Sequence, residues 1–222
     1  VTHVVDYDCD CPASTVADYF HCISIDDLGG VLNLAKSLKI VGIHTVANEL
    51  GNITANYVAE YLNLPSNGYQ IALDTTDKSR MKQVLFDGGL DTPISHAIKS
   101  FKELYEHDFC FPVIVKASDR SAGRGVSLAE SKEQLAKCYQ LAYDESYNKI
   151  VLVEEYVDGP QFSIETLSSL GSKQVIAITE MGFSGPPNFV ETEHFLPARI
   201  SDELSLKIRN YALKALEVFN IC

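Results

Sequence analysis

One segment limits the fold of this chain more than any other. Residues 112–117 read P-V-I-V-K-A, and the loop that follows, residues 118–126, reads S-D-R-S-A-G-R-G-V. β-Branched residues favour a strand, so the run predicts a strand that delivers Lys116 at its end. Gly123 and Gly125 would let backbone N–H groups approach phosphate oxygens, while the lysine supplies a charge. The segment predicts a phosphate-binding loop, although a solvated hairpin turn has the same sequence signature.

The loop differs from a Walker A motif, because no G-K-[ST] precedes a helix. Beyond it, the periodicity of apolar residues predicts an antiparallel α+β region. The expected elements are a helix over 131–143, a strand over 150–156, a hairpin over 161–167 and 174–181, an extended run over 189–196 and a helix after Ser201.

The first third of the chain has a different pattern, in which strands alternate with helices. Strands are expected over 2–6, 19–25 and 40–46, helices over 27–38 and 54–62, and a loop over 63–74. Thr54 is the expected N-cap of the second helix. Such alternation is typical of a parallel α/β sheet. A helix over 78–86, capped by Asp77, follows, and we place the domain boundary between residues 77 and 78.

Composition excludes several classes of protein. The net charge of −12 argues against a nucleic-acid partner, because such binding needs basic surface. No run approaches the ~18 apolar residues of a membrane span. The six cysteines form no C-x-x-C pair, so we expect free thiols and a cytoplasmic protein. Val1 is not Met and the chain stops directly after a helical pattern, so we expect a fragment of a longer protein.

Three further features support the phosphate-binding interpretation. Lys78 stands at a helix start, V-L-V-E-E-Y-V-D-G-P (151–160) places two carboxylates at a strand end, and F-S-G-P-P-N-F-V-E-T-E-H-F-L-P-A (183–198) is rich in Gly and Pro. In this order the features resemble the ATP-grasp superfamily, and most of all its carbon–nitrogen ligase branch. The superfamily includes L-amino-acid ligases, D-alanine–D-alanine ligase, biotin carboxylase and carbamoyl-phosphate synthetase. The resemblance covers nearly the whole chain and is most specific over 78–160.

The resemblance implies roles for residues around the phosphates. Lys78 and Lys116 would hold the phosphates of ATP, one from each side of a cleft. Ser121, Ala122 and Gly123 would form a mobile lid over the triphosphate.

For the rest of the nucleotide, the resemblance implies a second group of residues. Glu154 would accept the adenine amino group, and the backbone of Glu155 and Val157 would contact the ring in the hinge between two lobes. Gln161 stands where many relatives have a glutamate that binds the ribose, and it can still hydrogen-bond a hydroxyl.

For catalysis and metal binding, the sequence offers only two candidate residues and no complete motif. Glu191 and His194 are candidates for the phosphate or substrate side, although His194 would otherwise be read as a surface strand residue. The magnesium-binding patterns of the family, H-x-E and then E-x-N-x-R, do not occur here. The resemblance therefore implies Mg²⁺ ligands beyond residue 222, and we expect the fragment to be inactive by itself.

The expected fold is α/β and α+β: an incomplete parallel α/β pre-ATP-grasp domain over 1–77, then a partial ATP-grasp fold over 78–222. A lid subdomain would span about 93–156, and the C-terminal lobe would be truncated after 222. The implied function is the ATP-binding portion of a carboxylate–amine ligase that forms an acyl phosphate from small-molecule substrates. The apolar stripe over 204–219, if exposed, favours a homodimer.

Alternatives to the ligase interpretation remain open. One is a biotin-carboxylase-like enzyme that activates bicarbonate. Another is a non-catalytic nucleotide-binding module, and a third is an unrelated α/β protein whose loop resembles the motif by accident.

Overall fold

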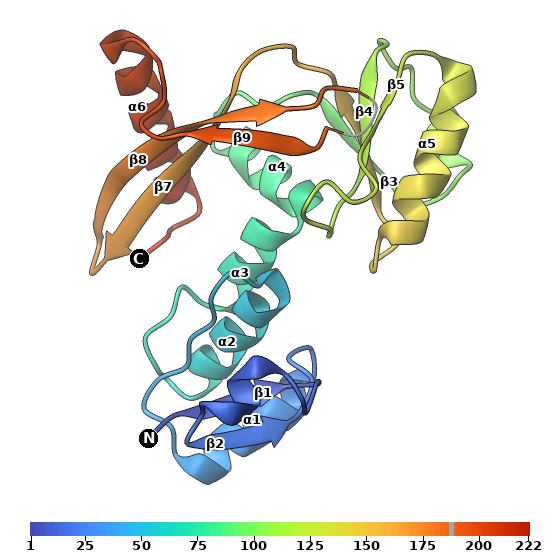
Figure 1. The fold of residues 1–222 in the computed structure, drawn as a ribbon. Coiled ribbons are helices and arrows are strands. Elements are labelled where there is room, and N and C mark those ends of the chain that lie inside the picture. The colour runs from blue at the N-terminus through green and yellow to red at the C-terminus, as the bar shows by residue number, and fades with distance from the viewer. Residues whose placement is uncertain (187–188) are drawn as a thin grey trace. The chain divides into compact units, whose positions relative to one another are not determined.

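The computed structural model describes residues 1–186 and 189–222, and these divide into two compact units, 1–76 and 77–222 (Figure 1). Both units mix helices with β-strands. Among the described residues, no helix combines the length and the apolar character that a membrane crossing requires.

The first unit contains a two-stranded parallel sheet and three helices. Its elements are β1 (His3–Asp6), a 3-10 turn (Pro12–Thr15), β2 (Tyr19–Cys22), α1 (Leu28–Leu38), α2 (Glu49–Tyr61) and α3 (Tyr69–Thr76). Val31, Leu32 and Ala35 of α1 pack with Val58 of α2 in the core of this unit. The parallel pairing of β1 with β2 agrees with the sequence pattern.

Two segments of the first unit differ from the sequence-based prediction. Residues 40–46 form no strand, because Ile40 and Ile43 instead pack against the core from an irregular segment. Residues 69–76 are helical although a loop was expected over 63–74. An apolar β-branched run predicts a strand only where a neighbouring strand can pair with it.

The second helix begins earlier than its sequence suggests. Asn48 is the N-cap of α2, and its side chain accepts a hydrogen bond from Gly51 N at 2.8 Å. Thr54, the predicted cap, lies inside the helix, where it is buried and its hydroxyl donates to the Ile25 carbonyl. A threonine hydroxyl can serve either purpose, so its sequence position alone does not locate the cap.

The cysteines also differ from the expectation that all are free thiols. Cys9 and Cys22 form a disulfide, with Cα atoms 5.4 Å apart. The register of β1 with β2 places Asp6 beside Cys22, so the turn after β1 brings Cys9 to the end of β2. This pairing depends on the fold and has no signature in the spacing of the cysteines.

The second unit contains two antiparallel sheets. Its elements are α4 (Lys78–Asp87), β3 (Ser95–Ile98), a 3-10 turn (Glu103–Tyr105), β4 (Val113–Ala117), β5 (Ser127–Ala129), α5 (Lys132–Glu145), β6 (Val151–Glu155), β7 (Gln161–Ser169), β8 (Ser172–Phe183), β9 (Glu191–Phe195) and α6 (Asp202–Val218). One sheet has the order β3-β6-β4-β5 and the other β7-β8-β9. Helix α5 lies beside the first sheet and α6 beside the second (Figure 1).

The four-stranded sheet has one face in the core and one face that carries charges. Side chains alternate between the faces, so Val113 and Val115 of β4 point into a core that also contains Leu135 of α5. Lys116 lies on the opposite face. The register of β4 with β6 places Lys116 opposite Leu152, and Glu154, two residues after Leu152, points to the same face. We call this second surface the charged face.

Helix α6 contacts the segment that follows α4. A Cβ atom on Gly88 would lie 2.5 Å from a methyl group of Val218, so only glycine permits this close approach. The Tyr211 hydroxyl donates to the Asp91 carbonyl at 2.6 Å. The rest of α6 is more exposed: none of its residues is fully buried, and Leu206 is 60% exposed.

The core of the second unit provides a test of the packing. Leu135 is 1% exposed, whereas Leu141 on the same helix is 51% exposed. We expect Leu135→Ala to lower the free energy of unfolding by about 2–5 kcal/mol, because it leaves a cavity between α5 and the sheet. Leu141→Ala should change it by less than about 0.5 kcal/mol. Urea unfolding followed by circular dichroism measures both, and equal effects would contradict the placement of α5.

Candidate functional site

The centre of the charged face is a buried ion cluster. Lys116 Nζ donates a hydrogen bond to Glu154 Oε1, and Lys82 Nζ lies 2.8 Å from Glu154 Oε2. The side chains of Glu154, Lys82 and Lys116 are 8%, 12% and 19% exposed. Each oxygen of the single carboxylate therefore has its own ammonium partner, and the cluster carries a net positive charge.

The electrostatics of Lys116 follow from this arrangement. Burial lowers the pKa of Lys116, the carboxylate of Glu154 raises it, and the charges of Lys82 and Lys78 lower it further. The pKa lies below its usual value as a result. An anion placed beside these ammonium groups would stabilise their charged forms, so the cluster favours binding of a phosphate or carboxylate.

A hydrogen-bonded network fixes the start of α4 against the end of β4. Asp77, the N-cap of α4, accepts from Ser118 Oγ at 3.1 Å and from Asn148 Nδ2 at 2.7 Å. Lys78 N donates to the Ser118 carbonyl at 2.8 Å. Lys78 Nζ donates to the Arg120 carbonyl at 2.5 Å, so its ammonium group lies at the beginning of the glycine-containing loop.

The loop has the positive φ angles that its glycines indicate, and Ala122 adopts one as well. Ala122, Gly123 and Gly125 have φ angles of 56°, 68° and 69°, which glycine adopts readily and alanine does not. The loop borders a cavity of about 620 Å³. The cavity is lined by residues 122–127, Leu141, Asp144, Glu145, Phe189, Val190 and Glu191. Pro187 and Asn188, which belong to the Gly/Pro-rich stretch 183–198, lie outside the described residues.

The residues proposed to contact adenine and ribose follow β6. The Glu155 amide donates to the Ile94 carbonyl at 2.9 Å, so a contact from this amide to a ring would have to replace that bond. Val157 is 60% exposed and thus accessible to a ligand. Gln161 is the first residue of β7 and is also exposed. Their roles stay predictions.

Glu191 and His194 are neighbours on β9. Glu191 Oε2 lies 3.5 Å from His194 Nε2, and both side chains are about half exposed, at 52% and 53%. Glu191 also borders the cavity beside the loop, so the structure brings it close to Ala122 and Gly123. Their contact with a substrate stays a prediction.

Lys82 was not among the residues predicted from the sequence. This lysine lies one helical turn after Lys78, and the i, i+4 spacing places both on the same side of α4. That spacing was the signal that could have identified it. The partner, Glu154, comes from a strand far away in the sequence, so only the fold shows that they meet.

The chain is similar to several known proteins. Residues 109–221 match the family described as the ATP-grasp domain. A D-alanine–D-alanine ligase from Halalkalibacterium halodurans is 24% identical over 208 residues, which are 88% of this chain and 66% of that protein.

Solved structures show the same fold. An L-amino acid ligase from Bacillus licheniformis matches with a TM-score of 0.79 and 23% identity, over 92% of this chain and 50% of that one. The biotin carboxylase domain of a 2-oxoglutarate carboxylase from Hydrogenobacter thermophilus, a structure with MgADP, ADP and bicarbonate, matches with a TM-score of 0.77 and 18% identity. That match covers 98% of this chain and 52% of the other. The chain thus spans between half and two thirds of the length of these proteins.

The hydrogen bonds to Asp77 should make the stability of the fold depend on pH. Burial raises the pKa of Asp77, but hydrogen bonds from Ser79, Arg80 and Ser118 outweigh burial and hold the pKa below its usual value. The ionised carboxylate therefore stabilises the fold above about pH 4, and this contribution is lost as the pH falls through the lowered pKa.

Asp77→Asn keeps an N-cap oxygen but removes the charge and one acceptor. We expect the variant to be less stable by about 1–3 kcal/mol at pH 7, because Ser118 and Asn148 lose their common acceptor. The difference should shrink as the pH approaches 3. Urea unfolding at both pH values measures it, and a difference that stays constant would show that the charge of Asp77 plays no part.

Proposed function

Because the chain belongs to the ATP-grasp domain family, we propose that it is the ATP-binding portion of an ATP-dependent carboxylate–amine ligase. The ligases among its relatives support this assignment. One observation carries it: Lys116 and Lys82 surround the buried Glu154 on the charged face, and Lys78 stands beside the adjoining glycine-containing loop. A positive cluster next to exposed loop backbone suits a polyphosphate.

Each side chain has a role in this proposal. Lys78 and Lys116 bind phosphate oxygens of ATP, and the loop of Ser121, Ala122 and Gly123 covers the triphosphate. Glu154 faces the adenine amino group. The carboxylate of Glu154 already has two lysine partners, so an adenine contact would be added to these ion pairs or would replace one of them.

Residues further along the chain complete the proposed nucleotide site. Glu155 and Val157 contact the adenine ring through their backbone, and Gln161 hydrogen-bonds the ribose. Glu191 and His194 stand on the substrate side. Exclusion of water by the loop would protect a reactive intermediate from hydrolysis.

The proposed reaction has two steps. A carboxylate oxygen of the first substrate attacks the γ-phosphorus of ATP, the bond from that phosphorus to the bridging oxygen breaks, and ADP leaves. The product is an acyl phosphate. An amine then attacks the acyl carbon, phosphate leaves, and the amine nitrogen loses a proton as the amide forms. The ammonium groups of Lys78 and Lys116 would stabilise the transferring negative charge.

Magnesium is the cofactor that ATP chemistry of this kind uses to neutralise phosphate charge. Among the residues that the structure describes, no three His, Cys, Asp or Glu side chains gather in a way that could hold a metal ion. The described residues therefore do not by themselves complete a Mg²⁺ site. We propose, as the sequence resemblance implies, that the Mg²⁺ ligands lie beyond residue 222.

A second candidate function is activation of bicarbonate. It is favoured by the fold shared with a biotin carboxylase domain, and it would use the same phosphate-binding lysines. An assay of ADP release by the full-length protein distinguishes the two functions. Bicarbonate would stimulate the release in one case, and an organic carboxylate together with an amine would stimulate it in the other. A cytoplasmic location and a homodimer formed through the exposed apolar residues of α6 are further proposals.

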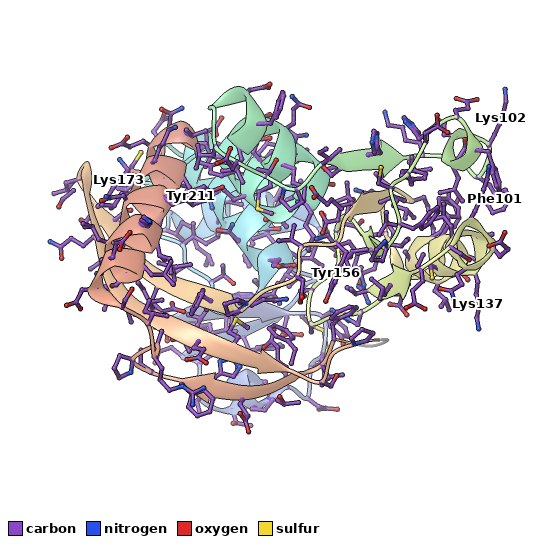
Figure 2. All side chains as sticks on the ribbon, turned by 90° about the horizontal axis from the view of Figure 1, so that it is seen from above. Phe101, Lys102, Lys137, Tyr156, Lys173 and Tyr211 are labelled. Carbon is purple, nitrogen blue, oxygen red and sulfur yellow. A yellow bond between two sulfur atoms is a disulfide. The ribbon has the colours of Figure 1, made fainter. Side chains whose placement is uncertain are left out.

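Nucleotide binding provides the central test. We expect Lys116→Met to weaken binding of the non-hydrolysable analogue β,γ-imido-ATP at least about tenfold, since a charge-assisted hydrogen bond contributes about 1.5–3 kcal/mol. Lys137→Met is the matched control, because Lys137 on α5 points into solvent (Figure 2). Calorimetry and the ligand-induced rise in melting temperature measure the effect. If the wild-type chain showed no protection by the analogue, the proposed nucleotide site would be wrong.

Turnover provides a separate test. The sequence patterns H-x-E and E-x-N-x-R, which the family uses for magnesium, are not present in the 222 residues. We expect these residues alone to release phosphate from ATP in the presence of Mg²⁺ no faster than a buffer control. A coupled phosphate-release assay measures this, and metal-dependent turnover would contradict the expectation.

A further inference from the structure

The two oxygens of Glu154 have different partners, and Lys116 is the partner that adjoins the glycine-containing loop. Oε1 accepts a hydrogen bond from Lys116 at the end of β4, next to the loop. Oε2 lies 2.8 Å from Lys82 Nζ of α4. If Lys116 turns toward a nucleotide phosphate, Glu154 loses its first partner and keeps the second.

A second partner matters because of burial. Glu154 is 7% exposed, and a buried carboxylate without a cationic partner is strongly unfavourable. With Lys116 as its only partner, Glu154 would hold that lysine back from the phosphate or would have to become protonated. A second ammonium group removes this conflict.

The surroundings of Lys82 distinguish it from the phosphate-binding lysines. The Lys78 ammonium group lies at the Arg120 carbonyl, beside the loop. Lys82 instead borders a separate cavity of about 310 Å³ between α4 and β3. The walls of that cavity include Phe86, Ile94, Ala97 and Leu152, which are apolar. Lys82 therefore borders a cavity that no residue of the loop lines.

We propose, on the basis of the nucleotide site above, that Lys82 is a positioning residue. It keeps Glu154 ionised and in place when Lys116 exchanges that carboxylate for a phosphate of the nucleotide.

The proposal has a consequence for protons. Among the residues that the structure describes, the charged groups that face Glu154 are Lys116 from β4 and Lys82 from α4, while Lys78 acts on Lys116 through space. On the β3 side the residue paired with Glu154 is Ser95, which is uncharged. Without Lys82, nucleotide binding would leave Glu154 with no ammonium partner, and we expect its buried carboxylate to take up a proton from the buffer.

Calorimetry of the 222-residue chain with β,γ-imido-ATP tests this. Titrations at pH 7.5 in HEPES and in Tris, whose ionisation enthalpies differ, give the number of protons bound. We expect Lys82→Met to bind at least about tenfold more weakly than wild-type. It should also take up a larger fraction of a proton on binding, and its affinity should recover as the pH falls. Lys82→Arg should restore both values toward wild-type.

The double variant Lys82→Met/Glu154→Gln is the decisive control, because it lacks the carboxyl group that would take up the proton. Its extra proton uptake should disappear. If Lys82→Met and Lys82→Gln bound weakly with unchanged proton uptake at every pH, Lys82 would be a direct phosphate ligand or a structural residue, and the inference would be overturned. Loss of binding in wild-type would instead refute the nucleotide site itself. Thermal unfolding of each variant confirms that it is folded.

Discussion

A carboxylate buried on a sheet face must have cationic partners, and this requirement on Glu154 organises the second unit. The pairing of β4 with β6 places Lys116 on the same face as Glu154. The second partner has to come from outside the sheet, so α4 must lie where Lys82 reaches the carboxylate. The network of Asp77, Ser118 and Asn148 then fixes the start of that helix. Charge burial and helix docking are thus satisfied together.

The cluster also explains how an acidic chain can hold an anion. The net charge is −12, yet within the cluster two lysines, Lys82 and Lys116, accompany one carboxylate, and the charge of Lys78 acts on Lys116 through space. Charge interactions between buried groups are screened far less than those on the surface, so the local excess of ammonium groups outweighs the distant carboxylates.

Much of this site could be predicted from sequence where the information is local. The strand that carries Lys116, the positive φ angles at Gly123 and Gly125, and the Asp77 cap all follow from neighbouring residues. Lys82 could not be predicted in this way, because its partner depends on how a helix docks on a sheet. The irregular segment over 40–46 and the Cys9–Cys22 disulfide in the first unit show the same limit, since each depends on strand pairing. Where the intrinsic propensity of a segment is ambiguous, tertiary contacts determine its structure.

The contact of Gly88 with Val218 has a mechanical consequence. Because no Cβ atom fits between them, the backbone of Gly88 at the end of α4 touches the side chain of Val218 in α6. The Tyr211 hydrogen bond to Asp91 adds a second point of attachment on the same segment. Two such points resist both sliding and rotation. A displacement of α6 would therefore be felt first at the C-terminal end of α4, the helix that carries Lys78 at its start and Lys82 in its middle.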